Sequence, residues 1–170
     1  MRCGIALGSN IENRLANLRA GCEQARSLNE VGPPIRASSI YETAPVDCEP
    51  GTMPYLNAVM EINFTGPPII LLDRLLKIEK AMGRPSTRPK NSSRIIDLDL
   101  LYAGKLVLNE PEIIIPHPRI NRRRFVLIPL AEISPDLVLP GQMRSVRSLL
   151  ENLDDRGQVM RLGISLFDRE

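Results

Sequence analysis

Apolar residues in the first half of the chain follow two spacings, one typical of strands and one typical of helices. Short runs rich in strand-forming residues predict strands, whereas apolar positions that step by three and four predict amphipathic helices. Pro67 and Pro68 fit the first turn of a helix, and Gly83 fits the position just after its last turn. The expected elements are strands at 3–9, 35–43 and 55–64 and helices at 12–28 and 67–82.

The second half of the chain is centred on the segment 94–102, "RIIDLDLLY", which has the composition of a buried strand but carries two acids. We expect a polar, basic loop before this strand and a hairpin turn after it, followed by a second basic loop and two helices. The expected positions are loops at 84–93 and 116–124, a short strand at 106–110, a helix within 125–135 and a helix at 146–152.

The order strand, helix, strand, strand, helix, strand matches the split βαβ arrangement of ferredoxin-like folds. We therefore predict an α+β fold with an antiparallel sheet and helices packed on one face. The other face would be left for loops and a ligand. The chain has no internal repeat and no change of composition that marks a boundary, so residues 1–170 are expected to form a single domain.

Asp97 and Asp99 are two residues apart, so their side chains should leave the strand on the same face. Their Cα atoms would lie about 6.6–7 Å apart. Two carboxylates this close repel each other, and hard cations such as Mg²⁺ relieve the repulsion. The pattern alone leaves two interpretations open, a metal site or acids that are solvated or paired with Arg94. The alternate residues would take the core face: Ile96, Leu98 and Leu100.

The net charge of +2 conceals an uneven distribution of charge along the chain. Residues 84–124 contain nine basic and four acidic residues, which places a local charge of +5 around the acid pair. A concentrated basic cluster attracts anions, most simply phosphates. Acids that hold metal, together with arginines that hold phosphate, favour a nucleoside triphosphate as the ligand. The chain lacks both the P-loop motif and the glycine-rich loop of protein kinases, so the site belongs to neither of those classes.

Cysteine and histidine usage narrows the classes of protein further. The three cysteines are scattered without metal-ligand spacing, which predicts reduced thiols in a cytoplasmic protein. The chain has no apolar run near the roughly 18 residues of a membrane span. His117, the only histidine, lies between two prolines, and the residues alone allow either a structural turn or a contact to phosphate.

Four segments, taken together and in order, resemble one family. They are "ALGSN", "YETAPV" followed by "YLNAV", "GRPSTRPKNSSRIIDLDLL", and "PHPRINRRRFVLIPLAEI". Over about residues 3–141 the chain resembles the 6-hydroxymethyl-7,8-dihydropterin pyrophosphokinases of folate biosynthesis. The resemblance implies a ferredoxin-like fold and transfer of the β,γ-pyrophosphoryl group of MgATP to the hydroxymethyl group of the pterin, with release of AMP.

The resemblance also implies roles for individual residues. The carboxylates of Asp97 and Asp99 match the ligands of two magnesium ions. The catalytic residues would be Asp97, Asp99, Arg84 and Arg94. ATP would be bound by Glu79, Arg84, Arg88, Arg94, His117 and Arg123. The pterin would be bound by Thr43, Val46, Tyr55, Asn57 and Phe125, with the two aromatic rings stacked on the flat heterocycle. The residues alone leave core packing as the alternative role for the two rings.

The chain departs from the family pattern in the loop before the acid pair. Ser86 stands where the family usually has a second arginine. Asn91 stands where the family commonly has an aromatic residue, and Ser92 and Ser93 stand where it usually has Gly-Pro. A missing guanidinium removes charge stabilisation during transfer, and Arg88 would compensate only in part. We expect the same reaction with slower turnover or weaker ATP binding.

Two alternative functions follow from the same residues. One is a catalytically weak or dead relative kept as an interaction domain, and the other is a ferredoxin-like nucleic-acid-binding module. Aromatic residues make up only 4% of the chain, and the two acids would repel a phosphate backbone. The expected partners are therefore ATP and the pterin, and neither nucleic acid nor a membrane. A monomer is expected, with a weak homodimer as the alternative.

Overall fold

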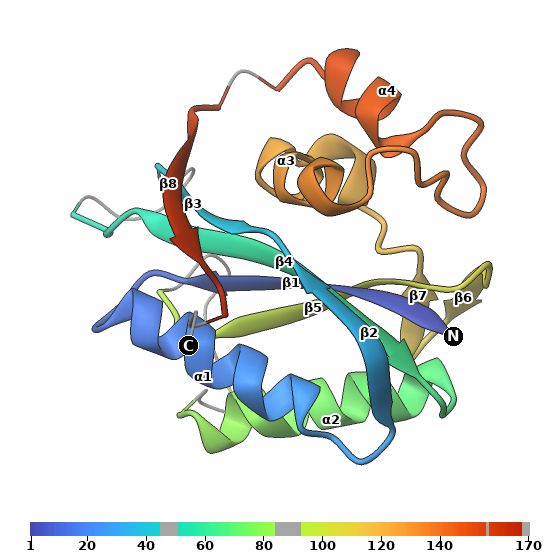
Figure 1. The fold of residues 1–170 in the computed structure, drawn as a ribbon, viewed down its shortest axis with the longest axis horizontal. Coiled ribbons are helices and arrows are strands. Elements are labelled where there is room, and N and C mark those ends of the chain that lie inside the picture. The colour runs from blue at the N-terminus through green and yellow to red at the C-terminus, as the bar shows by residue number, and fades with distance from the viewer. Residues whose placement is uncertain (45–50, 84–92, 156, 168–170) are drawn as a thin grey trace.

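The computed structural model describes residues 1–44, 51–83, 93–155 and 157–167, which form an antiparallel sheet with helices on both faces (Figure 1). The helices are α1 (Arg14–Arg26), α2 (Pro68–Ala81), the 3-10 turn η1 (Ile120–Arg122), α3 (Arg124–Ile133) and α4 (Val146–Glu151). The strands are β1 (Arg2–Ser9), β2 (Val31–Ala37), β3 (Ser39–Thr43), β4 (Tyr55–Phe64), β5 (Asp97–Ala103), β6 (Leu108–Glu110), β7 (Ile113–Ile115) and β8 (Val159–Ser165).

The sheet confirms the ferredoxin-like α+β prediction. Its strands lie in the order β5-β1-β4-β3-β8. β2 and β3 both pair with β4, at different positions along that strand. All of these pairs are antiparallel. The first and last strands of the split βαβ unit, β1 and β5, are therefore neighbours. This pairing places the turn after β1 beside the start of β5, where the two aspartates lie.

Helices α1 and α2 cover one face of the sheet, below it in the view of Figure 1. Their apolar side chains step by three or four residues and pack against alternate residues of β1, β4 and β5. Side chains of Ile96, Leu98 and Leu100 lie in this core with at most 6% of their surface exposed, as the alternation predicts. The acids between them consequently point to the opposite face.

That opposite face, expected to be left for loops and a ligand, is partly covered by α3 and α4. Val126, Leu127 and Leu130 of α3 pack there against Val59 and Leu101 of the sheet. Helices thus lie on both faces of the sheet, because the apolar stripe of α3 needs a second apolar surface to cover it. Among the described residues, the end of this face that carries the acids borders a cavity.

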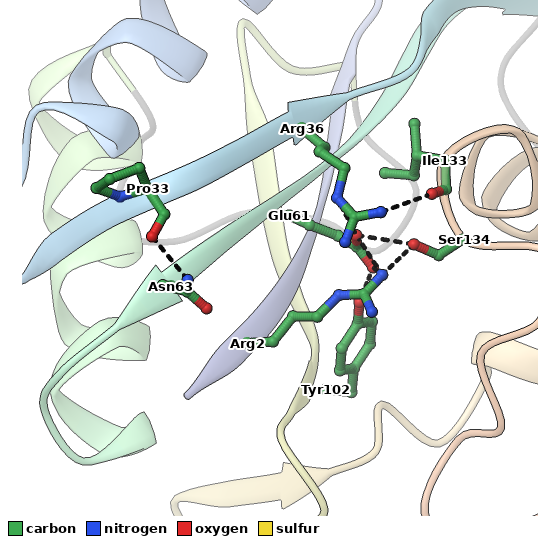
Figure 2. A network of polar contacts seen from close by, with 8 residues as sticks. All are labelled: Arg2, Pro33, Arg36, Glu61, Asn63, Tyr102, Ile133 and Ser134. Carbon is green, nitrogen blue, oxygen red and sulfur yellow. Dashed lines mark hydrogen bonds and ion pairs between the residues drawn. The ribbon is translucent and has the colours of Figure 1, made fainter.

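A buried polar cluster fixes the C-terminal end of α3 to the sheet (Figure 2). We call it the Glu61 cluster, and its members are Arg2, Arg36, Glu61, Tyr102 and Ser134. Glu61 of β4 is only 2% exposed, lies 2.6 Å from the Arg2 guanidinium and accepts a hydrogen bond of 2.8 Å from the Ser134 hydroxyl. The Tyr102 hydroxyl donates to the same carboxylate, and burial followed by the charge of Glu61 raises the tyrosine's pKa.

Several element boundaries differ from the predictions. β2 begins at Val31 rather than at residue 35. Its two prolines are tolerated because they fall where the pairing with β4 shifts register and no ladder N–H is needed. β5 begins at Asp97 rather than at residue 94. The strands β7 and β8 were not predicted. In the described ranges, none of the helices combines the length and the apolar character that crossing a membrane requires.

Candidate active site

The acid pair lies at the start of β5, on the open part of the second sheet face. Asp97 pairs with Gly8 of β1, and Asp99 pairs with Ala6, so the neighbours of the acids on β1 are both small. A Cβ built on Gly8 would meet Asn57 Oδ1 at 3.4 Å and the Asp97 Cβ at 3.9 Å. The glycine therefore keeps the floor between the acids and β4 open.

Two arginines face the acids from separate segments. Arg94 Nη1 donates to Asp97 Oδ2 at 2.6 Å, and Arg123 Nη1 lies 3.6 Å from Asp99 Oδ2. Burial and the neighbouring charge of Asp97 nevertheless raise the pKa of Asp99. The pair thus keeps part of its mutual repulsion even with arginines beside it, and a cation bound between the acids would relieve it.

The turn after β1 holds the segment that leads into the acid pair. Asn10 is fully buried, and its side-chain oxygen accepts the backbone N–H of Arg94 at 2.7 Å. Its backbone N–H donates to the Arg94 carbonyl at 3.1 Å, and its side-chain amide donates to the Ser93 hydroxyl at 3.1 Å. The residues alone did not assign this role, because the contact joins positions that are 84 residues apart.

A first cavity of about 340 Å³ opens beside the acids. The residues of this cavity that the sequence predicted are Thr43, Tyr55, Asn57, Arg94, Asp97, Asp99, Arg123 and Phe125. Asn57 and Thr43 are nearly buried and joined by a hydrogen bond of 2.8 Å from the amide to the hydroxyl. The Arg123 guanidinium lies 5.4 Å from the centre of the Phe125 ring. The cavity combines aromatic walls, a fixed amide and charged groups at one end.

A second cavity, also of about 340 Å³, lies between α2 and the β6–β7 hairpin. Its apolar lining includes Leu72 and Leu76 from α2 and Ile113 from β7. Its polar lining includes Glu112 and three residues that the sequence singled out: Glu79, Asp99 and His117. Asp99 lines both cavities. One carboxylate of the acid pair is therefore accessible from either side.

Glu79 and His117 are each oriented by a backbone contact. Glu79 is 1% exposed, and its Oε1 accepts the N–H of Leu98 at 2.7 Å, which fixes β5 between the two acids. His117 Nδ1 accepts the N–H of Arg119 at 3.1 Å. Burial lowers the pKa of His117, although Asp99 opposes the shift, so the ring is neutral near pH 7 and its proton lies on Nε2.

The structure thus brings together every predicted site residue that it describes. Three predicted residues, Val46, Arg84 and Arg88, lie outside the described residues. The sequence missed other residues that line the first cavity, on α3 and in the segment before β8: Arg124, Asp155, Gly157, Gln158 and Val159. Arg124 belongs to none of the predicted binding sets, and no local sequence pattern marks the segment near 155–159.

The donor set fits magnesium. In the described part of the chain no three histidine, cysteine or acidic residues gather as a metal-binding group. Mg²⁺ does not need such a group, because it keeps several waters and takes one or two carboxylates together with substrate phosphates. Asp97 and Asp99 would supply the carboxylates, and both line the first cavity. Paired acids among arginines are the groups that metal-dependent phosphoryl transfer would require.

Comparison with known proteins identifies the family. The model of the 7,8-dihydro-6-hydroxymethylpterin-pyrophosphokinase (HPPK) family matches residues 4–135. Two relatives are named 2-amino-4-hydroxy-6-hydroxymethyldihydropteridine pyrophosphokinase, and each is 37% identical to this chain. The match to the Haemophilus influenzae protein covers 81% of this chain and 84% of that protein. The match to the Methylorubrum extorquens protein covers 92% of this chain and 96% of that protein. The chain belongs to the HPPK family.

Longer proteins contain a similar part. The chain is 37% identical to the folic acid synthesis protein fol1 of Pneumocystis carinii over 89% of its own length but only 20% of that protein. A crystal structure of wild-type Plasmodium falciparum HPPK-DHPS with pteroate superposes with a TM-score of 0.68 at 14% identity, over 88% of this chain and 42% of that one. At this identity the structural likeness supports the fold alone.

Proposed function

We propose that the chain transfers the β,γ-pyrophosphoryl group of ATP to 6-hydroxymethyl-7,8-dihydropterin, a step of folate biosynthesis. The hydroxymethyl oxygen forms a bond to the β-phosphorus, the bond from that phosphorus to the α,β-bridging oxygen breaks, and AMP leaves while the hydroxyl loses its proton. Membership of the HPPK family supports this reaction. The observation that carries it is that Asp99 lines both cavities, so two substrates could meet at one carboxylate.

The first cavity suits the pterin. Tyr55 and Phe125 are half-buried and line it, and flat heterocycles stack well on aromatic rings. Asn57 and Thr43 form a fixed polar edge that can read the donors and acceptors of the ring. Val46, which the resemblance also assigns to the pterin, remains a prediction.

The second cavity suits the nucleotide. Its apolar lining can cover the base, and its polar end is formed by Glu79, His117 and Asp99. His117 would donate from Nε2 to a phosphate oxygen, since Nδ1 already accepts a backbone N–H. Arg94 and Arg123, beside the acids, would bind phosphates as well. Roles for Arg84 and Arg88 remain predictions from the resemblance.

Magnesium would be held by Asp97 and Asp99. Bound there, it would neutralise charge that develops on the transferring phosphates. The number of ions, two by the resemblance, is part of the proposal. The contacts of Arg94 to Asp97 and of Arg123 to Asp99 allow each arginine to hold its carboxylate until metal and phosphate are bound.

Four broader predictions belong to the proposal as well. A single domain is supported by β8, which pairs with β3 in the same sheet as the N-terminal strands. A cytoplasmic location is supported by Cys3 and Cys22, which are buried free thiols. A monomer remains the expected state. A nucleic-acid module is disfavoured, because the tyrosines at positions 41 and 102 on the second sheet face are buried rather than available for stacking.

The test is an assay of AMP release from MgATP and 6-hydroxymethyl-7,8-dihydropterin. The proposal predicts AMP only when both the pterin and Mg²⁺ are present. A folded protein that binds both substrates but releases no AMP would instead be a catalytically dead relative. A protein that binds neither substrate would overturn the assignment of both cavities.

A further inference from the structure

The segment that leads into β8 contributes a wall to the first cavity, although it lies beyond residues 4–135 that the family model matches. Asp155, Gly157, Gln158 and Val159 all line the cavity. Val159 pairs with Thr43 of β3, so β8 brings this segment alongside one of the polar residues of the cavity. The site is therefore built in part from the C-terminal end of the chain.

Asp155 contacts the first turn of α3. Arg123, the residue before this helix, has no side-chain oxygen that could accept a hydrogen bond from the first turn. Asp155 Oδ2 instead accepts the backbone N–H of Arg124, the first helical residue, at 3.0 Å. Its negative charge also lies at the positive end of the helix dipole. A residue from another segment thus supplies the cap.

The same carboxylate connects the helix to the segment before β8. Asp155 Oδ1 accepts the N–H of Gly157 at 2.8 Å, and the Asp155 carbonyl accepts from the Arg124 guanidinium at 3.4 Å. The two oxygens of one side chain therefore hold two walls of the cavity in register. Because Ser134 at the other end of α3 is bound in the Glu61 cluster, both ends of the helix are held.

The first turn of α3 carries the residues that face the ligands. Arg123 directly precedes it and approaches Asp99, and Phe125 is its second residue and lines the cavity. We propose that Asp155 is a positioning residue for the pterin: it caps α3, sets Phe125 over the first cavity and closes that cavity with the segment 157–159. This inference rests on the proposed function, because it takes the first cavity as the pterin site.

The test compares Asp155→Ala with Asp155→Asn and with a control, Asp154→Ala. Asp154 is exposed and, among the described residues, belongs to the lining of neither cavity. The readouts are kcat and the KM values for pterin and for ATP. Loss of a cap weakens local order by about 1 kcal/mol, so Asp155→Ala should raise the KM for pterin about 5-fold. The KM for ATP should rise less than the KM for pterin, because Arg123 precedes the capped turn but also contacts Asp99.

Asn keeps an oxygen that can accept the Arg124 N–H, so Asp155→Asn should restore most of the pterin affinity, and Asp154→Ala should match the wild type. If Asp155→Ala does not fold, Asp155→Glu is the second variant, because it displaces the carboxylate by one methylene. It should raise the KM for pterin more than the KM for ATP, by less than Asp155→Ala would. An unchanged KM for pterin, or equal increases for pterin and ATP, would overturn the inference. A wild-type protein without activity would overturn the proposed function instead.

Discussion

Two clusters of acids and arginines lie on the same face of the sheet, and they differ in how their charges are matched. In the Glu61 cluster one carboxylate faces two arginines and two hydroxyl donors, Tyr102 and Ser134. At the start of β5, two carboxylates lie on the same strand face, and burial followed by the charge of Asp97 raises the pKa of Asp99 in spite of nearby arginines. The carboxylate of the first arrangement is matched by protein donors, whereas a cation would relieve the repulsion that the second keeps.

The difference teaches how to separate a structural ion cluster from a functional one. Both contain acids and arginines, and both are at least partly buried, so composition does not distinguish them. Glu61 holds α3 against the sheet, away from the linings of both cavities within the described residues. Asp97 and Asp99 border open volume. Substitution should therefore affect stability in one cluster and activity in the other.

The largest effect is expected at the acid pair. Asp97→Asn and Asp99→Asn should each lower kcat/KM for AMP release by at least about 100-fold, because each removes a metal ligand beside the transferring phosphates. The melting temperature without Mg²⁺ should hold or rise, since the repulsion between the carboxylates is removed. Activity within about 2-fold of the wild type would refute the assignment of metal ligands.

The next effect is expected in the Glu61 cluster. Glu61→Ala removes the acceptor of two buried hydroxyls and the partner of two partly exposed arginines, which should lower the free energy of unfolding by about 2–3 kcal/mol. Urea unfolding at pH 7 measures this loss. Glu61→Gln is the matched control and should lose less, because its amide oxygen still accepts. The protein that remains folded should keep a kcat near that of the wild type. A 100-fold fall in kcat would show that the Glu61 cluster acts in catalysis as the acid pair does.

A smaller effect should appear at alkaline pH. The pKa of Tyr102 is raised in the folded state, so the unfolded chain loses this proton first, near the usual value of about 10. The stability that depends on the neutral phenol is fully present below that pH and falls as pH rises toward the folded-state pKa, by up to about 1.4 kcal/mol per pH unit. The free energy of unfolding should therefore fall more between pH 8 and pH 11 for the wild type than for Tyr102→Phe. Equal losses in the two proteins would show that Tyr102 titrates normally.

The smallest effect concerns the loop before the acid pair. Ser86 lies outside the described residues, and its departure from the family pattern stays a prediction. Ser86→Arg should raise kcat or lower the KM for ATP by several-fold, about 3-fold to 10-fold, because it returns a guanidinium to the loop. Ser86→Gln is the control for side-chain length. If neither constant changes, the missing arginine does not limit this protein.

Much of the fold could be predicted because its signals are local. The helices α1 and α2 follow from residue spacing, and the alternation in β5 separated Leu98 of the core from the acids on either side. β8 could not be predicted, because it is an edge strand with mostly partly or fully exposed side chains and a glycine at 163. Its position depends on pairing with β3, a contact far away in the sequence.

The site was predicted to the extent that its residues lie in family motifs. The motifs led to Asn57, Asp97 and Phe125, which the structure places in one cavity. They did not lead to Asp155, whose partner Arg124 is 31 residues away, because a cap supplied by another segment leaves no trace in either local sequence. The Glu61 cluster was missed for the same reason, since its hydrogen bonds span 41 to 132 residues.

The most direct measurement is the identification of the products by ³¹P NMR after incubation of the protein with MgATP and 6-hydroxymethyl-7,8-dihydropterin. Pyrophosphoryl transfer at the acid pair predicts AMP and a pterin diphosphate ester in equal amounts, with neither product formed by Asp99→Asn. Formation of ADP, or equal amounts of AMP from the wild type and Asp99→Asn, would contradict the account.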